Sequence, residues 1–326
     1  MLIDTIDALL LDLDGTVWEG GRSLPHTPEI IGDATVPVVF VTNNAFRHPT
    51  LVATILNDMG IKAGAEQVYT SAGAALGLAR ERVGEGAQLL VIGSDSFKDL
   101  ARDAGFVLVD SADDDPAAVL HGHNPETGWK QLSEAAVAIQ RGAVYLATNL
   151  DTSLPTERGF LVGNGSMVAA VTSVTGVTPE AAGKPQPVMF HQAVRDLGAK
   201  RPLAVGDRLD TDIAGAVAAG IPSLHVLTGV SGPHALIGAP KEQRPTYIGK
   251  DFSALREGAE QLLPGPQGGF QARIDYNGIV LSGGGANPDP LAALRTVLQV
   301  AWDMSAAPTE VRPESAAAEE ACAQWW

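Results

Sequence analysis

The stretch Leu9-Leu10-Leu11-Asp12-Leu13-Asp14-Gly15-Thr16 places two carboxylates at the end of an apolar run. Residues 8–13 are typical of a short, buried parallel strand, and open α/β sheets bind ligands at the carboxyl ends of such strands. Side chains two apart on a strand share a face, so Asp12 and Asp14 can reach one pocket. Two like charges are costly to bury unless a cation joins them or one is protonated. The alternative is a simple turn, where Asp and Gly are common.

Three further segments place polar groups where strands end or helices begin. The apolar run 38–41 leads into a Thr and two Asn, and the run 203–205 leads into a Gly and an acid. A Lys and a Pro stand just before a predicted helix over 186–197, and helix starts favour Pro near the first turn. The polar groups of these segments are Thr42, Asn43 and Asn44, then Lys184, then Asp207, with Thr211 and Asp212 opening another predicted helix.

In this order, the four motifs resemble those of the haloacid dehalogenase (HAD) superfamily of phosphatases. The resemblance covers residues 5–262, and Gly206-Asp207-Arg208-Leu209-Asp210-Thr211-Asp212 is similar to the class IIA branch, which has a large cap inserted midway. That branch includes nitrophenylphosphatase-like, phosphoglycolate and glycerol-phosphate phosphatases. The resemblance implies a phosphoric monoester hydrolase that acts on small phosphorylated metabolites. It points first to glycerol 3-phosphate, with phosphoglycolate or another sugar or nitrophenyl phosphate monoester as the alternative substrate.

The resemblance assigns catalytic roles to three side chains. Asp12 would attack phosphorus and form an aspartyl-phosphate, which splits hydrolysis into two easier displacements. Asp14 would protonate the leaving alkoxide and then activate water. Lys184 would neutralise the nucleophile and the phosphoryl oxygens, because positioned charge is the main resource in phosphoryl transfer. An isolated Lys is otherwise a solvated surface residue, so its place among the motifs is what singles it out.

Mg²⁺ is the cofactor that the resemblance implies. Its protein ligands would be the Asp12 carboxylate, the Asp14 backbone carbonyl and the Asp207 carboxylate, with water and a phosphate oxygen completing the octahedron. Asp212 would lie behind these ligands and orient metal-bound waters or Lys184. Alternatively, Asp212 is a simple acid in the first turn of a helix.

The phosphate group would be held by the loop that follows the second predicted strand. The Thr42 hydroxyl and amides at Asn43, with Asn44 beside them, are expected to bind its oxygens. Relatives often carry a Ser after the two Asn, where this chain has Ala45. One phosphate contact of the family is therefore expected to be missing or moved.

Alternating strands and helices predict an α/β fold, with a doubly wound, Rossmann-like parallel sheet in a core built from 1–70 and 179–262. Residues 71–178 alternate in the same way and predict a complete small α/β domain. In the family this insert is the cap, which closes over the pocket, excludes water and selects the leaving group. Residues 263–304 are predicted to be a linker and a small C-terminal α+β appendix, followed by a disordered tail over 305–326.

Substrate choice is expected to reside in the cap loops. In His121-Gly122-His123-Asn124-Pro125, His123 and Asn124 replace the aromatic and the acid of the usual family loop. One of the histidines, His123 in our assignment, is expected to hydrogen-bond the leaving group together with Asn124. The alternatives are an exposed polar turn, or a metal site at His121 and His123 that lacks an apparent third ligand. Asn149, Asp151 and Arg158 resemble a second cap segment of the family, one that faces the core.

The composition of the 326 residues, with 18% charged and 45% hydrophobic, is ordinary for a globular protein. No apolar run approaches a membrane span and no basic region precedes an apolar stretch at the N-terminus, so we expect a cytoplasmic protein. The single cysteine, Cys322, excludes an intrachain disulfide and a thiolate metal cluster. The net charge of −16 argues against nucleic acid and anionic membranes. The expected partners are a small phosphorylated metabolite and a second copy bound through the cap.

Two other activities stay open at this point. A response-regulator receiver also uses an aspartate acceptor, Mg²⁺, a hydroxyl residue and a Lys, and it would be a phospho-accepting signalling module. Receivers are shorter and lack an acid two residues after the acceptor. A dehalogenase would share Asp12 without needing Asp14.

The appendix lies beyond residue 262, near which relatives in this branch commonly end. It resembles a fragment of an acyltransferase-like domain. The run Gly283-Gly284-Gly285 lacks the phosphate-cradling pattern of a coenzyme A site, so we expect an interaction or stabilising role.

Overall fold

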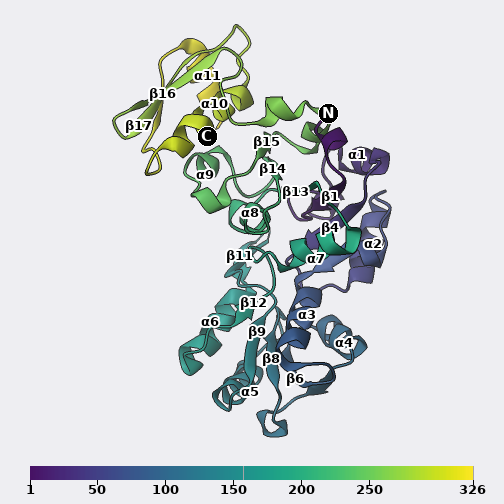
Figure 1. Cartoon of the computed structure of the whole chain (residues 1–326). Coiled ribbons are helices and arrows are strands. Elements are labelled where there is room, and N and C mark those ends of the chain that lie inside the picture. The colour runs from purple at the N-terminus through teal and green to yellow at the C-terminus, as the bar shows by residue number, and fades with distance from the viewer. Residues whose placement is uncertain (157, 326) are drawn as a thin grey trace. The chain divides into compact units, whose positions relative to one another are not determined.

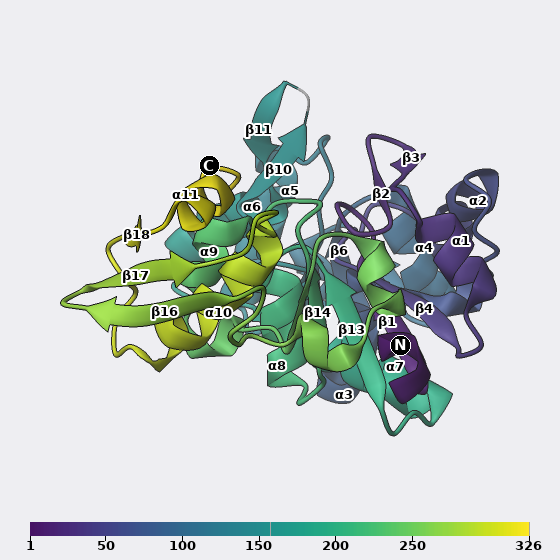
Figure 2. The ribbon, with the colours of Figure 1, turned by 90° about the horizontal axis from the view of Figure 1, so that it is seen from above.

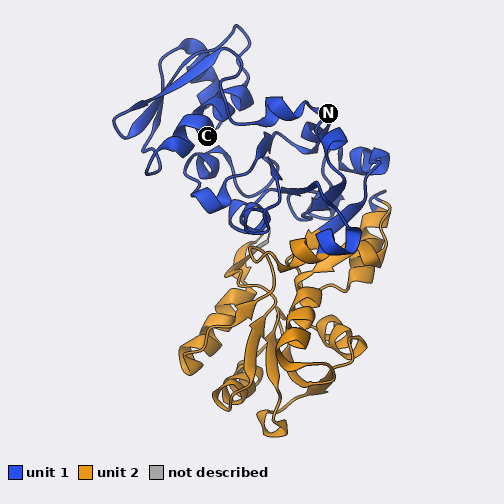
Figure 3. Ribbon diagram, in the orientation of Figure 1, with its two compact units in different colours: residues 1–40, 59–61, 193–326 blue, residues 41–58, 62–192 orange. Residues whose placement is uncertain are grey.

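The computed structural model describes residues 1–156 and 158–325 (Figure 1). The chain divides into two compact units, which are coloured separately in Figure 3. Unit 1 comprises 1–40, 59–61 and 193–326, and unit 2 comprises 41–58 and 62–192. The predicted cap lies within unit 2, whereas the predicted core contributes residues to both units. The domain boundaries inferred from the sequence therefore stay a prediction.

The first sheet has the strand order β15-β14-β13-β1-β4-β5, and every pairing from β15 to β4 is parallel. Figure 2 shows β14, β13, β1 and β4 in this order. Its strands are mostly apolar, as expected where helices cover both faces of a parallel sheet, although β14 contains Ser223 and His225. Four of them, β1, β4, β13 and β14, are buried at every residue, which confirms the predicted α/β core. The strands are β1 (Ala8–Leu11), β4 (Val38–Thr42), which crosses the unit boundary, β5 (Val68–Thr70) of unit 2, β13 (Pro202–Gly206), β14 (Ser223–Val226) and β15 (Tyr247–Gly249).

Short helices and turns connect these strands. The helix predicted to open with Thr211 and Asp212 is divided into a π-helical turn, η4 (Leu209–Ile213), and α8 (Ala214–Ala218). The predicted helix over 186–197 begins two residues later, as α7 (Val188–Leu197). The other elements of unit 1 before residue 263 are η1 (Leu2–Thr5), the hairpin β2 (Trp18–Glu19) with β3 (Arg22–Ser23), α1 (Thr27–Asp33), α9 (Pro233–Ile237), η5 (Lys241–Gln243), η6 (Phe252–Arg256) and η7 (Ala259–Leu262).

Unit 2 contains a second parallel sheet, with the order β12-β9-β8-β6-β7. Its strands and helices confirm the small α/β domain predicted for this segment, although α6 and the hairpin β10 with β11 were not predicted. The strands are β6 (Gln88–Ile92), β7 (Val107–Val109), β8 (Ala118–His121), β9 (Val144–Ala147), β10 (Ser153–Thr156), β11 (Gly159–Val162) and β12 (Glu180–Ala181). The helices are α2 (Pro49–Asp58), η2 (Ala65–Gln67), α3 (Ser71–Val83), α4 (Asp95–Asp103), η3 (Ala112–Asp114), α5 (Trp129–Gln140) and α6 (Asn164–Thr175).

The C-terminal residues of unit 1 form a three-stranded sheet and two helices. The strands β16 (Phe270–Asp275) and β17 (Gly278–Gly283) make an antiparallel hairpin, which turns at Tyr276 and Asn277 (Figure 2). With the helix α10 (Pro290–Asp303), the hairpin confirms the predicted α+β appendix. The strand β18 (Val311–Pro313) pairs in parallel with β17, and α11 (Ala316–Cys322) follows it. We call residues 267–325 the C-terminal module.

The prediction of a disordered tail over 305–326 is wrong for its described part, which contains β18 and α11. The Ser315 side chain caps α11 by accepting a hydrogen bond from the Ala318 backbone N–H at 3.1 Å. Ala318, Ala321 and Trp325 are buried in one apolar cluster with α10. The segment is rich in Ala, whose side chains bury little apolar surface, and such a composition favours disorder. In the structure the segment is ordered because it packs on the apolar face of α10.

Candidate active site

The ends of β1 and β13 bring the predicted carboxylates together. The strands pair in parallel with Leu11 opposite Val205, and the Asp12 backbone N–H donates to the Val205 carbonyl at 2.9 Å. Residues 12 and 207 therefore leave the sheet at the same edge. Carboxylate oxygens of Asp12, Asp207 and Asp212 all lie within 4.8 Å of one another. The structure thus gathers three of the acids that the sequence singled out.

Asp207 is fully buried and is held by several hydrogen bonds. Its Oδ2 accepts the Val230 backbone N–H at 2.7 Å, and its Oδ1 accepts the Thr16 hydroxyl at 3.3 Å. Its backbone carbonyl accepts the Ser231 N–H at 3.1 Å. Gly15 permits this arrangement, since its φ is +87° and a Cβ there would lie only 2.6 Å from Asp207 Oδ2. The carboxylate is therefore fixed in one orientation.

Asp212 is also buried and lies within η4. Its Oδ2 accepts the Arg208 backbone N–H at 3.1 Å, four residues earlier in the chain. Its carboxylate also belongs to the group of three, so its location fits a ligand as well as a residue behind the ligands. The segment forms a π-helical turn, and Asp212 lies in its first turn, so the alternative of a simple acid near a helix start stays a prediction.

The group of three carboxylates fits a magnesium ion. Hard oxygen ligands are what Mg²⁺ prefers, and it is usually bound through a small number of carboxylates. Three negative charges at this separation, two of them on buried side chains, are unfavourable unless a cation balances them. Within residues 1–156 and 158–325, this is the group of metal-ligating side chains that the structure brings together.

Asp14 differs from the expectation that both acids of the first motif are buried. Its side chain is exposed, and its Oδ1 accepts the Trp18 indole N–H at 2.7 Å. A bridge between residues 14 and 18 closes the turn that contains Gly15 and Thr16. Trp18 itself is buried, so it anchors the Asp14 carboxylate at the surface.

Lys184 is buried in unit 2, with 3% of its surface exposed. Its Nζ donates to the Val41 carbonyl at 2.8 Å, next to the predicted phosphate loop. Its backbone carbonyl accepts the Asn43 side-chain amide at 2.9 Å. The ammonium group is therefore not the solvated surface group that an isolated lysine usually is.

The predicted phosphate loop is built by its own side chains. The Thr42 hydroxyl accepts the Asn44 backbone N–H at 3.1 Å, which leaves its own proton for donation. The Asn44 Oδ1 accepts the N–H groups of Phe46 and Arg47, so this side chain forms the turn. The Asn43 amide also donates to Asp151 at 3.2 Å. Thr42, Asn43 and Lys184 are thus linked within unit 2.

Family models match the chain where these motifs lie. A model described as haloacid dehalogenase-like hydrolase matches 9–107, a HAD-hydrolase-like model matches 181–255, and a GCN5-related N-acetyltransferase like domain matches 267–325. The D-glycerol 3-phosphate phosphatase of Mycobacterium tuberculosis is 40% identical over 313 residues, which cover 94% of this chain and 89% of that protein. The chain belongs to the haloacid dehalogenase-like hydrolases.

Solved structures of other proteins agree with this HAD assignment. The crystal structure of a glycerol phosphate phosphatase from M. tuberculosis in complex with magnesium matches with a TM-score of 0.94 at 39% identity, covering 99% of this chain and 98% of that chain. A 4-nitrophenylphosphatase from Thermotoga maritima matches with a TM-score of 0.72 at 28% identity, over 80% of this chain and 99% of that chain. The nitrophenylphosphatase-like branch suggested by the motif at 206–212 is confirmed.

The cap loop of this HAD protein is more buried than a polar turn would be. His121 is fully buried, its Nδ1 lies 2.9 Å from the Tyr145 hydroxyl, and burial lowers its pKa to about 4. Burial also lowers the pKa of the partly exposed His123. The Asn124 side chain donates to the Gly93 carbonyl and accepts the Glu126 N–H, both at 3.0 Å. These bonds favour a turn-forming role for Asn124, and substrate contacts by His123 and Asn124 stay a prediction.

Sequence reasoning missed several residues that support the HAD motifs. Thr228 follows β14 and its hydroxyl donates to the Gly15 carbonyl at 2.6 Å. Ser71 follows β5 and its hydroxyl donates to the Asn43 carbonyl at 2.7 Å, which also accepts the Asn149 amide at 2.9 Å. Both follow the pattern of a strand that ends in polar residues, so the same signal could have found them. The bond from Trp18 to Asp14 has no such signal.

Proposed function

We propose that this chain is a Mg²⁺-dependent phosphatase of small phosphorylated metabolites and that glycerol 3-phosphate is its substrate. The observation that carries the proposal is the gathering of Asp12, Asp207 and Asp212 at the ends of parallel strands. The substrate is the one named for the M. tuberculosis relative, which resembles this chain over nearly its whole length. Phosphoglycolate and other sugar or nitrophenyl phosphate monoesters are the alternative substrates.

The reaction proceeds in two displacements. A carboxylate oxygen of Asp12 attacks the phosphorus, the bond to the ester oxygen breaks, and Asp14 gives a proton to the leaving glycerol oxygen. Asp14 then takes a proton from water, whose oxygen attacks the aspartyl-phosphate and breaks the bond between phosphorus and Asp12. Inorganic phosphate leaves, Asp12 is again a free carboxylate and Asp14 has regained its proton.

Residues from both parts of the predicted core, 1–70 and 179–262, stabilise the negative charge on the phosphoryl oxygens during the reaction. Lys184 supplies a positive charge, while the Thr42 hydroxyl and amides at Asn43 donate hydrogen bonds to the phosphoryl oxygens. Asp12, Asp207 and the Asp14 backbone carbonyl would hold Mg²⁺, with Asp212 beside or behind them. The bound ion supplies further positive charge for the phosphoryl oxygens.

Phosphate release tests this proposal directly. The purified chain should release phosphate from glycerol 3-phosphate with Mg²⁺ and lose that activity with a chelator. Asp12→Asn should lower the rate by at least about 10³-fold, because the amide is a poor nucleophile of similar shape. A circular dichroism spectrum like that of the wild type shows that the variant is folded.

Two outcomes would contradict the proposal. Wild-type-like turnover by Asp12→Asn would remove Asp12 from its role. A stable phosphoprotein without turnover would instead support a phospho-accepting signalling module. Comparing kcat/KM for glycerol 3-phosphate, phosphoglycolate and nitrophenyl phosphate under the same conditions identifies the preferred ester.

The cap over 71–178 is part of the same proposal, as the segment that selects the leaving group and joins two copies in a homodimer. Phe160, Leu161 and Val162 of β11 are exposed, with 80%, 49% and 59% of their surfaces accessible, and exposed apolar patches mark interaction sites. Light scattering that gives the mass of a monomer would contradict the dimer.

A cytoplasmic location is proposed for the enzyme. None of the helices in the described part of the chain has the length and apolar character needed to cross a membrane. The net charge of −16 is unfavourable for binding anionic membranes. Recovery of the enzyme in a membrane or secreted fraction would contradict this location.

A further inference from the structure

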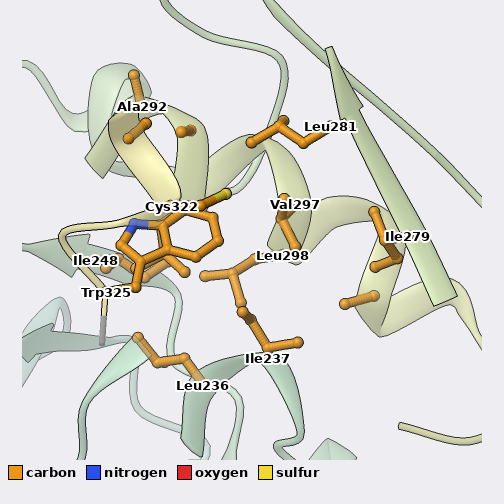
Figure 4. Close-up of a cluster of buried hydrophobic side chains, with 14 of the residues drawn as sticks. Leu236, Ile237, Ile248, Ile279, Leu281, Ala292, Val297, Leu298, Cys322 and Trp325 are labelled. Atoms are coloured by element: carbon orange, nitrogen blue, oxygen red, sulfur yellow. The ribbon is translucent and has the colours of Figure 1, made fainter. Parts of the chain in front are cut away.

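One apolar cluster of unit 1 joins the C-terminal module to the segment that carries the metal-site aspartates. Leu209 and Ile213 of η4 belong to it, and they are 3% and 1% exposed. Leu236 and Ile237 of α9 belong to the same cluster. Figure 4 shows Ile237 next to Leu298 of α10, and Leu236 below the Trp325 indole. The segment between Asp207 and Ile213 therefore shares its core with the C-terminal module.

A second connection runs through the loop over 227–232, which follows β14. This loop donates the Val230 and Ser231 backbone N–H groups to Asp207, at 2.7 and 3.1 Å. The Ser231 hydroxyl accepts the Leu209 N–H at 3.1 Å, and the His225 Nε2 lies 2.8 Å from the Ser231 carbonyl. The loop thus fixes both Asp207 and the start of η4. It leads directly into α9, whose N-cap is Gly232.

Trp302 of α10 holds α9 in place. Its indole N–H donates to the Leu236 carbonyl at 2.9 Å. The Arg244 guanidinium lies over the indole, 5.6 Å from the ring centroid, and donates to the Trp302 carbonyl at 2.7 Å. Arg244 also donates to the Ala239 carbonyl at 3.0 Å, just after α9. Trp302 is therefore bonded to the helix that begins where the Asp207 loop ends.

The first turn of α10 disfavours an anionic ligand such as the pyrophosphate of an acyl carrier. The Asp289 carboxylate accepts the Leu291 N–H at 2.9 Å, and Pro290 has no N–H to offer. A negative charge at a helix N-terminus repels a further anion. The C-terminal module matches an acetyltransferase-like family model, but the start of α10 does not favour binding of an acyl carrier. The role of the module is therefore inferred from its packing.

We propose that the C-terminal module is a positioning element for the metal site, and that Trp302 is its positioning residue. The module holds α9, α9 fixes the loop over 227–232, and this loop orients Asp207. Residues that hydrogen-bond to metal ligands commonly affect metal affinity. The negatively charged ligands repel one another, so neighbouring residues must hold them in the binding geometry. The inference rests on the proposed function in one respect, that Mg²⁺ is the ion bound by these carboxylates.

Binding of Mg²⁺ alone, measured by calorimetry on the full chain without substrate, tests the proposal. Trp302→Phe keeps an aromatic ring, smaller than the indole, and removes the N–H donor, and it should raise the Kd for Mg²⁺ about threefold to tenfold. Leu298→Ala, which opens the cluster and removes no hydrogen-bonding group, should raise the Kd in the same direction. Saturating Mg²⁺ should return kcat of both variants to near the wild-type value, which a loss of folded protein would not allow.

The matched control is Leu56→Ala in α2. Leu56 and Leu298 are both fully buried leucines on helices, but Leu56 lies outside the shared cluster. Leu56→Ala should lower the melting temperature as Leu298→Ala does, with an unchanged Kd for Mg²⁺. An equal rise in Kd for Leu56→Ala, or no rise for folded Trp302→Phe and Leu298→Ala, would overturn the proposal.

Failure of the proposed function gives a different result. A wild-type chain that binds Mg²⁺ but releases no phosphate from any tested ester would refute the phosphatase, while the Kd comparison would still decide the positioning role. A wild-type chain that binds no Mg²⁺ would overturn both proposals.

Discussion

At the scale of single residues, the exposed Asp14 makes the role of its neighbour Trp18 testable. A carboxylate at the surface has many orientations available, and the indole N–H selects one of them. A general acid must be held within hydrogen-bond reach of the leaving oxygen to act. The structure therefore adds Trp18 to the functional residues of the first motif, which ended at Thr16 in the sequence analysis.

We expect Trp18→Phe to lower kcat for glycerol 3-phosphate about threefold to tenfold, since one hydrogen bond is worth ~0.5–1.5 kcal/mol. Nitrophenyl phosphate should lose less, because nitrophenolate leaves without needing a proton. Steady-state kinetics with both esters measure the difference. Equal losses for the two esters would show that Trp18 acts on stability or binding and not through Asp14.

The sequence predicted the acids of the site better than it predicted their supports. Asp12 and Asp207 were found because each follows an apolar run, and parallel pairing then brings the run ends to one edge. Besides the bond from the Thr16 hydroxyl, Asp207 is held by backbone N–H groups of Val230 and Ser231, and backbone groups carry no sequence signal. Burial of Asp14 was predicted from its neighbours, but the turn at Gly15 directs it outward.

At the scale of elements, we expect α11 and the residues that follow it to contribute to the free energy of unfolding. Trp325 is 7% exposed, lies against the shared cluster, and its indole N–H donates to the Pro290 carbonyl at 3.0 Å. Trp325→Ala should lower the free energy of unfolding by about 3 kcal/mol, the lower end of the range for large buried aromatics. Urea denaturation followed by circular dichroism measures this loss.

Trp129 provides the matched control. It is 83% exposed at the start of α5, so Trp129→Ala should change the free energy of unfolding by less than about 0.5 kcal/mol. Similar losses for the two variants would mean that α11 does not pack on the cluster. The comparison uses the same substitution at a buried and an exposed tryptophan.

Elements with a strong periodic pattern were predictable, and elements defined by their neighbours were not. The hairpin of β16 and β17 and the helix α10 carry alternating or amphipathic patterns of their own. In contrast, α11 is rich in Ala and Glu, and its helix is completed by the Ser315 cap and by packing on α10. The π-helical turn of η4 contains Asp212, whose carboxylate lies beside that of Asp207, and helix propensity does not predict such a turn.

At the scale of the whole molecule, two buried histidines make stability depend on pH. Burial lowers the pKa of His121 and of His225 to about 4, from an ordinary value of 6.5. The unfolded chain therefore binds protons between pH 6.5 and 4 that the folded chain does not bind. Stability is complete above pH 6.5 and is lost as the pH falls toward 4. At pH 5.5 each histidine accounts for a loss on the order of 1 kcal/mol.

Urea unfolding curves at pH 7.5 and 5.5 should show this loss in both units, since His121 lies in unit 2 and His225 in unit 1. His121→Asn should make the pH dependence shallower, because Asn does not titrate and keeps a polar atom near the Tyr145 hydroxyl. The control is His26→Asn, at an exposed position with a left-handed backbone that Asn tolerates. An unchanged slope in His121→Asn would mean that this histidine is not held neutral in the folded state, because a histidine couples acid to unfolding in this direction only when it is neutral in the folded chain and charged in the unfolded chain.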